Sequence, residues 1–209
     1  MKVPRLPLLG FALATAAPLH AQGFSVGVSA ASVQLFEGSS ANRFTGSGFG
    51  LSAGWSSGRF KIRADVIRAQ LTPSDTGRSA FSAVQLDGLL SYQIRPALQA
   101  EAGLGLRTVS PQFATQDVGV FRIGIRSEGA LGQLAGVWAR GALLPVVRFN
   151  GGGSSGAALE VGFGTWIALA RGRVRAELDY ALQRIDRSVQ GTALPLQSAT
   201  TRLGAVIKL

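Results

Sequence analysis

The chain lacks cysteine altogether, and its only histidine is His20, close to the N-terminus. Without cysteine there can be no disulfide, no thiolate nucleophile, no cysteine-ligated zinc and no lipid-modified cysteine. Beyond residue 20 the chain also has no imidazole that could act as a general base near neutral pH. Only scattered carboxylates remain as metal ligands, so the sequence predicts neither a metal site nor a cofactor.

Long hydrophobic runs are missing after the first 21 residues, so no transmembrane helix is predicted there. A shorter apolar run, LPLLGFALATAAPL, follows Lys2 and Arg5 and precedes the small residue Ala21. This layout predicts a secretory signal peptide over residues 1–21 and an exported domain over residues 22–209. A retained membrane anchor is the alternative, which the prolines within the segment disfavour.

Acidic residues are scarce, with 11 Asp and Glu against 21 Lys and Arg, and the formal net charge is +10. A basic excess of this kind raises the possibility of nucleic-acid binding. The basic residues are spread singly through apolar runs, however, and nowhere form the stripe that phosphate binding requires. The sequence therefore predicts no nucleic-acid partner.

Glycine and alternating polarity are what the chain has in abundance. Glycine makes up 28 of 209 residues, about twice its ~7% share in average proteins, and it disfavours helix interiors. Residues 173–183, RVRAELDYALQ, place charged residues at alternate positions with apolar residues between them. This period of two predicts a strand with one polar face, although Val174, Leu178 and Leu182 would also share one face of a helix.

Similar alternation recurs about ten times along the chain. The predicted strands cover residues 24–30, 48–55, 60–66, 84–94, 98–107, 121–126, 134–147, 159–167, 173–183 and 202–209. Tight turns are predicted at residues 56–58, 95–96, 129–133 and 170–172, and longer polar loops at residues 37–43, 72–80, 110–116, 148–156 and 186–196. Short turns at one end and longer loops at the other predict an all-β, up-and-down antiparallel barrel of about ten strands. Misassignment of residues 129–147 would reduce the number to eight.

The two faces of such strands can be arranged in two ways. A soluble, lipocalin-like barrel turns its apolar face inward, whereas a membrane barrel turns it toward lipid. No charge falls on the apolar face in the central part of any run, as expected where a lipid-facing Arg or Lys costs about 2–4 kcal/mol. Arg68 and Arg184, which continue that face, both lie near the longer-loop end. The sequence therefore predicts a transmembrane barrel with the polar face in the lumen.

Aromatic residues near the strand ends are consistent with this orientation, because membrane barrels carry aromatic girdles at both interfaces. The residues predicted to form the girdles are Phe44, Phe81 and Phe149 beside the longer loops, and Trp55, Phe60 and Tyr92 beside the short turns. Four arginines cluster at the short-turn end and are predicted to face anionic lipid head groups: Arg59, Arg95, Arg171 and Arg173.

The last eight residues, RLGAVIKL, carry a further signal in Arg202, Gly204, Ile207 and Leu209. This pattern resembles the C-terminal assembly signal of bacterial outer-membrane β-barrel proteins, which usually end in Phe or Trp. The resemblance implies a bacterial outer-membrane location, periplasmic termini, and outer-membrane lipids and the barrel-assembly machinery as partners of a monomer. Enzymes of this family mostly use His with Ser or Asp, so no enzymatic activity is predicted for this chain.

A luminal polar face would gather sixteen charged side chains, nine basic and seven acidic. They are Lys61, Arg63, Asp65, Asp87, Glu101, Arg107, Arg122, Arg126, Glu128, Arg140, Glu160, Arg175, Glu177, Asp179, Arg202 and Lys208. Mutual pairing would remove the cost of unpaired charge in a confined interior. The sequence thus predicts a filled, ion-paired lumen with a structural or interaction role. A narrow passive channel for small anions is the first alternative, and a lipid-modifying enzyme is the second.

Overall fold

The structure, a computed structural model, describes residues 23–75, 77–109 and 117–209. The predicted signal peptide over residues 1–21 and the predicted loop over residues 110–116 lie outside the described residues. Within the described ranges, no helix is long and apolar enough to cross a membrane.

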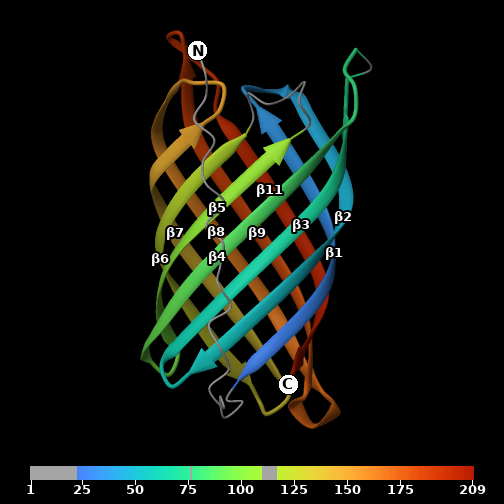
Figure 1. The fold of residues 1–209 in the computed structure, drawn as a ribbon, viewed down its shortest axis with the longest axis vertical. Helices are drawn as coiled ribbons and strands as arrows, with labels where there is room; N and C mark the ends of the chain where they lie inside the picture. The colour runs from blue at the N-terminus through green and yellow to red at the C-terminus, as the bar shows by residue number, and fades with distance from the viewer. Residues whose placement is uncertain (1–22, 76, 110–116) are drawn as a thin grey trace, which may run out of the picture.

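The described chain forms one closed antiparallel barrel of ten long strands (Figure 1). The strands are β1 (Phe24–Glu37), β2 (Ser39–Ser57), β3 (Phe60–Pro73), β4 (Phe81–Arg95), β5 (Leu98–Val109), β6 (Val118–Leu131), β7 (Ala135–Phe149), β8 (Ser154–Leu169), β9 (Val174–Val189) and β11 (Leu196–Lys208). Each pairs with its neighbours in the sequence, and β11 closes the barrel by pairing with β1. A two-residue strand, β10 (Thr192–Ala193), pairs only with β9. The predicted up-and-down barrel of ten strands is confirmed.

The strands are longer than predicted, between 12 and 19 residues. Only Gly38 separates β1 from β2, where a loop over residues 37–43 was expected, and most of residues 186–196 belongs to β9, β10 and β11. These loop predictions are wrong because continued strand pairing satisfies the backbone N–H and C=O groups of the polar segments. At the other end the turns are short, and there Ser25 of β1 pairs with Lys208 of β11. We call the two ends of the barrel the long-loop end and the short-turn end.

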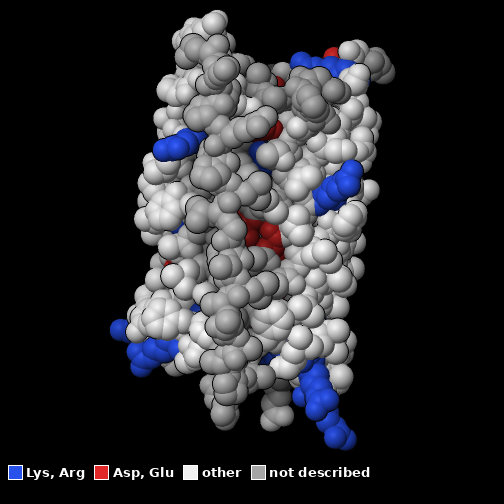
Figure 2. All heavy atoms as spheres, in the orientation of Figure 1, with Lys and Arg blue, Asp and Glu red and all other residues white. Residues whose placement is uncertain are grey.

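The outer wall is apolar around the whole barrel, from the short-turn end past the middle. Exposed side chains from all ten long strands contribute to this apolar band: Val28, Phe49, Ile62, Leu90, Leu104, Ile125, Leu143, Phe163, Leu178 and Leu203. Figure 2 shows one side of the wall, where Lys and Arg lie mainly toward the two ends and most of the surface between them, apart from one acidic patch, is uncharged. Such a band on a closed barrel is the surface that a hydrocarbon environment selects.

The two faces of the strands exchange character toward the long-loop end. On β3 the inward-facing side chains change from Arg63 and Asp65 to the buried Ile67 and Leu71, while the outward face becomes polar at the exposed Arg68. Because side chains alternate along a strand, a segment surrounded by water must turn its apolar side chains inward. The barrel therefore continues beyond its apolar band as a segment with a water-facing exterior.

An apolar core fills the barrel at the long-loop end. It consists of Val33, Leu35, Phe44, Ala69, Leu71, Phe81, Ala83, Val118, Val120, Leu144, Ala158, Ile185 and Leu196, with Val109, Val147 and Phe149 packed against it. Phe44 and Phe81 are almost fully buried and meet edge to face, with ring centroids 5.0 Å apart.

The predicted aromatic girdle at the long-loop end is wrong, because Phe44, Phe81 and Phe149 belong to this core and point inward. Burying an aromatic side chain above the apolar band removes it from water, which an outward position there would not do. At the short-turn end Phe60 and Tyr92 lie on the outer surface, as predicted, with ring centroids 5.0 Å apart. Trp55 is exposed there too.

Candidate functional site

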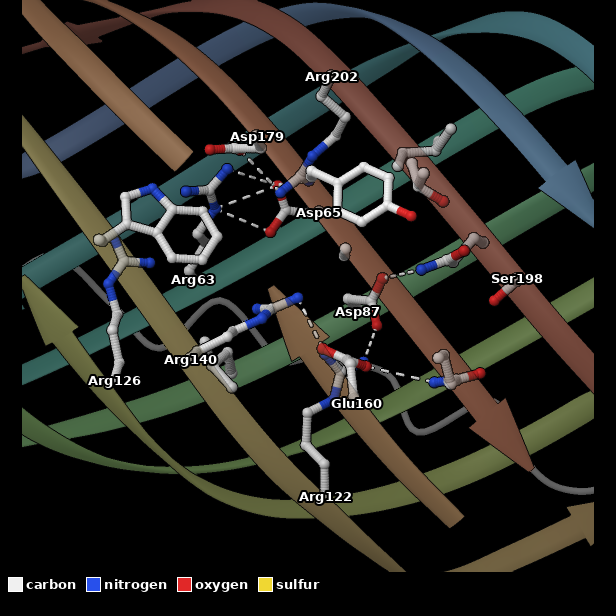
Figure 3. A pocket seen from close by; sticks show the side chains of 18 residues that line it. Arg63, Asp65, Asp87, Arg122, Arg126, Arg140, Glu160, Asp179, Ser198 and Arg202 are labelled. Atoms are coloured by element: carbon white, nitrogen blue, oxygen red, sulfur yellow. Dashed lines mark hydrogen bonds and ion pairs between the residues drawn. The ribbon is translucent and has the colours of Figure 1, made fainter. Parts of the chain in front are cut away.

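The polar interior between the apolar core and the short-turn end is the candidate functional site (Figure 3). Twelve of the sixteen charged residues predicted for the lumen form ion pairs there. They are Arg63, Asp65, Asp87, Arg122, Arg126, Glu128, Arg140, Glu160, Arg175, Glu177, Asp179 and Arg202. The other four, Lys61, Glu101, Arg107 and Lys208, have no carboxylate or cation within ion-pairing distance among the described residues.

One cluster of ion pairs joins β3, β9 and β11. Arg202 on β11 binds Asp65 on β3 and Asp179 on β9, each at 3.1 Å. Arg63 binds the same Asp65 carboxylate through Nε at 2.8 Å and lies 3.7 Å from Glu177. Because β1 and β2 lie between β11 and β3 in the sheet, the Arg202–Asp65 pair links strands that share no backbone hydrogen bonds.

A second cluster joins β4, β6, β7 and β8. Arg122 on β6 pairs with Asp87 on β4 and, at 3.2 Å, with Glu160 on β8. Arg140 on β7 binds the same Glu160 at 2.7 Å, and the Gln183 amide donates to its second carboxylate oxygen at 3.3 Å. A cavity of about 60 Å³ remains between the two clusters, which is room for a few water molecules.

Inward-facing glycines make space for these arginines. A Cβ atom on Gly105 would lie 2.8 Å from Nη2 of Arg122, and one on Gly162 would lie 3.0 Å from Nε of Arg140. A larger side chain at either position would force the neighbouring guanidinium to shift. The long side chains of Arg122 and Arg140 therefore cross the lumen where glycines leave room for them.

Two tryptophans lie inside the barrel among the arginines. Arg126 lies over the ring of Trp138 at 4.2 Å, and Arg140 lies 5.8 Å from the same ring. Trp166 lies 3.9 Å beneath Arg175 and donates its indole N–H to Glu128 at 3.0 Å. Sequence reasoning did not assign either tryptophan to the site, although both occupy the polar phase of their strands.

A third cluster lies nearer the short-turn end, around Glu128. This carboxylate lies 3.4 Å from Arg126 and 3.6 Å from Arg175, and Arg175 lies 3.8 Å from Glu177. A cavity of about 350 Å³ lies next to this cluster, among residues near the ends of the strands. The exposed Lys61 and Lys208 line it, so solvent reaches it.

Two buried arginines lie closer to the apolar core. Arg107 is only 6% exposed, and its Nε and Nη2 atoms find no hydrogen-bond partner in the described part of the chain. Arg187, which was expected in a loop, is buried. Its guanidinium lies 3.7 Å from the Glu37 carboxylate and 4.4 Å from the ring of Phe149. It also donates a hydrogen bond to the carbonyl of Gly152 at 2.9 Å. Arg187 thus holds three segments of the long-loop end together.

The outer wall has a groove of about 510 Å³ next to the second cluster. The small residues Ala64 and Gly88 line the groove together with Leu104, and part of Asp65 and Asp87 is reached through it. Figure 2 shows an acidic patch in the middle of the wall. Both carboxylates pair with luminal arginines, and the exposed Arg148 also lines the groove.

The remaining predicted residues lie near the strand ends. Ile207 and Leu209 of the predicted assembly signal are exposed, and a Cβ on Gly204 would lie 2.7 Å from the carbonyl oxygen of Val28. The four arginines of the short-turn end, Arg59, Arg95, Arg171 and Arg173, are all exposed. Recognition of either group by lipids or by an assembly machine remains a prediction. Within the described ranges, no three His, Cys, Asp or Glu side chains are grouped to hold a metal ion.

Comparison with known proteins gives no match to any family model and no sequence match to a curated protein. Solved structures do match. The outer membrane protease OmpT from Escherichia coli has a TM-score of 0.61 at 10% identity, covering 91% of this chain and 98% of OmpT. The chain has the fold of bacterial outer-membrane β-barrels.

Two further barrels are similar at 10% identity. An outer membrane channel from Pseudomonas putida F1 has a TM-score of 0.52, covering 93% of this chain and 100% of the channel. The translocator domain of the autotransporter NalP from Neisseria meningitidis has a TM-score of 0.51, covering 92% and 90%. A protease, a channel and a translocator share this fold, so the fold alone does not select a role for this barrel.

Proposed function

We propose that the protein is an outer-membrane β-barrel with a closed interior, and that its role is structural or interaction-based rather than transport. The observation that carries this proposal is that two layers fill the lumen one after the other along the barrel. The first layer is the ion-pair clusters and the second is the apolar core. The apolar band supports the membrane location, because it would be exposed to water in any other setting. The segment beyond the band then projects into water at the cell surface.

The ion-pair clusters support a closed interior on energetic grounds. Removing one partner of a buried pair leaves an uncompensated charge, which costs about 3–5 kcal/mol. A solute that passed through the lumen would have to displace Arg202 or Arg122 from two carboxylates each. Glu160 and Asp65 each hold two arginines in the same way. The pairs therefore favour a fixed interior over a conducting one.

The apolar core argues in the same direction against the channel alternative. Leu35, Phe44, Leu71, Phe81, Ile185 and Leu196 are each no more than 1% exposed. An ion crossing this layer would lose its hydration without gaining polar partners. The enzyme alternative has no imidazole after His20 on which to build acid–base chemistry.

Single-channel recording in planar lipid bilayers tests the closed interior. We expect no discrete conductance steps from the refolded wild-type protein. A triple variant, Leu35→Ser, Leu71→Ser and Phe81→Ser, would hydrate the core and is expected to raise the current. The matched control carries Ser at the outward-facing Gln34, Gln70 and Val84, and it should behave as the wild type. Regular conductance steps from the wild-type barrel would contradict the proposal.

A further inference from the structure

We propose that the cavity at the short-turn end is a binding site for small phosphorylated anions. We call this 350 Å³ cavity the vestibule; Lys61, Lys208, Ser25, Ser52, Glu128 and Arg175 are among its lining residues. The inference rests on the proposed closed barrel, because a cavity that ends at an ion-paired layer binds a solute rather than passing it on.

The space of the vestibule comes from the small side chains of β1 and β2. Their inward-facing residues beside the cavity include Ser25, Ser52, Gly54 and Ser56. A Cβ on Gly54 would already lie 2.7 Å from the Ser25 hydroxyl. Arginines and tryptophans fill the opposite side of the barrel at this level, so the vestibule lies on the side of the β1–β2 hairpin.

Cations outnumber carboxylates around the vestibule by five to three. The cations are Lys61, Arg63, Arg126, Arg175 and Lys208, and the carboxylates are Glu101, Glu128 and Glu177. An excess of positive charge in a concave, partly enclosed site attracts and concentrates anions.

The carboxylates of the vestibule already have partners. Glu128 lies within 3.6 Å of Arg126 and Arg175, and it accepts the indole N–H of Trp166. Glu177 lies 3.7 Å from Arg63 and 3.8 Å from Arg175. Glu101 accepts a hydrogen bond from the Ser91 hydroxyl at 3.4 Å. The acids of the vestibule are thus occupied by its arginines or by a hydroxyl.

The two lysines are different. Neither Lys61 nor Lys208 is within ion-pairing distance of a carboxylate in the described part of the chain. They lie on β3 and β11, on either side of the β1–β2 hairpin, and both line the vestibule. A ligand placed against the hairpin would therefore have an unpaired ammonium group on each side.

The chemistry of the free donors selects the class of ligand. Lysine binds phosphate as a compact point charge, whereas planar recognition of a carboxylate favours the fork of an arginine, and the arginines here are engaged. The hydroxyls of Ser25 and Ser52 can donate to phosphate oxygens or bind sugar or glycerol hydroxyls. A volume of about 350 Å³ lies at the small end of the range for small-molecule sites. These features fit a small phosphorylated polyol.

Titration calorimetry on the folded protein in lipid nanodiscs tests the site, with inorganic phosphate and glycerol 3-phosphate as probes. We expect saturable binding of both and none of glycerol. The double variant Lys61→Gln/Lys208→Gln removes two charges and should weaken binding at least tenfold. The control Arg68→Gln/Arg184→Gln removes the same net charge from the outer wall of the long-loop end and should leave affinity unchanged. Folding of each variant is verified by its heat-modifiable migration on gels.

Three results would overturn the inference. They are the absence of saturable phosphate binding, an equal loss of affinity in the two double variants, and binding of acetate as tight as that of phosphate. Each would leave the closed barrel in place, since that proposal stands or falls on conductance. A conducting wild-type barrel that binds phosphate through both lysines would instead refute the closed interior and retain the site.

Discussion

Glu160 shows how a single residue can decide the arrangement of the interior. Its carboxylate holds both Arg122 at 3.2 Å and Arg140 at 2.7 Å, and all three side chains are at most 14% exposed. Replacing Glu160 by Gln keeps the shape of the side chain but removes the negative charge that the two guanidinium groups share. A single substitution therefore leaves positive charge in this cluster without a carboxylate to balance it.

We expect Glu160→Gln to lower the free energy of unfolding by about 3 kcal/mol, because one partner of a buried ion pair is removed. Urea unfolding in phospholipid vesicles, followed by tryptophan fluorescence, measures the change. The matched control is Asp186→Asn in the exposed Arg184–Asp186 pair on the outer surface, which should cost less than 1 kcal/mol. Equal effects of the two variants would show that the luminal pairs are as weak as surface pairs.

Close packing at glycine gives a second prediction at the residue scale. A Cβ on Gly164 would lie 2.6 Å from the Leu178 carbonyl oxygen and 2.7 Å from both Asp179 Oδ1 and Trp138 Cε2. Gly164→Ala should therefore destabilise the barrel by about 1–3 kcal/mol, as overpacking does elsewhere. Gly141→Ala is the control, because nothing lies within 4 Å of the added atom there. The same unfolding assay distinguishes them, and similar stabilities for both variants would contradict the packing argument.

At the scale of the strand, the exchange of faces explains both the successes and the failures of sequence reasoning. Alternation located all ten long strands and placed the charged side chains in the lumen, because the charges are absent from one face through the apolar band. It did not reveal the core, since the same alternation continues with its polarity reversed. On β3 the reversal leaves two adjacent apolar residues, Val66 and Ile67, between an outward apolar row and an inward one.

The missed residues could have been found from their spacing, because residues an even number of positions apart lie on the same face of a strand. Arg187 is an even number of positions from Arg175, Glu177 and Asp179 on β9, and it points inward as they do. If the predicted strands had been extended into the neighbouring polar segments, the same spacing would have placed Phe81 in the core as well. The individual ion pairs could not be predicted, because Arg202 reaches Asp65 across two intervening strands and that partnership depends on the curvature of the closed barrel.

A prediction for the extended strands concerns the core. Leu71→Ala removes a fully buried side chain and should lower the free energy of unfolding by about 2–5 kcal/mol. Gln70→Ala on the outward face of the same strand is the control and should change stability by less than about 0.5 kcal/mol. Both variants should still insert into vesicles, because the apolar band is intact. Loss of insertion by Leu71→Ala alone would mean that the core forms before the membrane-spanning part.

At the scale of the whole molecule, the orientation of the apolar band leads to a prediction about fractionation. The protein should remain in the membrane pellet after washing with high salt or alkali, and should be released only by detergent, because the band around its wall is apolar throughout. Unheated samples should migrate differently from boiled samples on gels. Recovery of the folded protein from a soluble periplasmic extract would contradict the membrane location.

In the proposed orientation, the segment beyond the apolar band also forms the surface that a phage or an antibody would meet at the cell. A phage, an antibody or a neighbouring cell would contact the rim of a sheet that is supported from within by packed phenylalanines and leucines. The recognisable surface would be assembled from residues that are distant in the sequence. Antibodies raised against the native protein should therefore lose their epitopes on boiling, and short synthetic peptides should compete poorly for them.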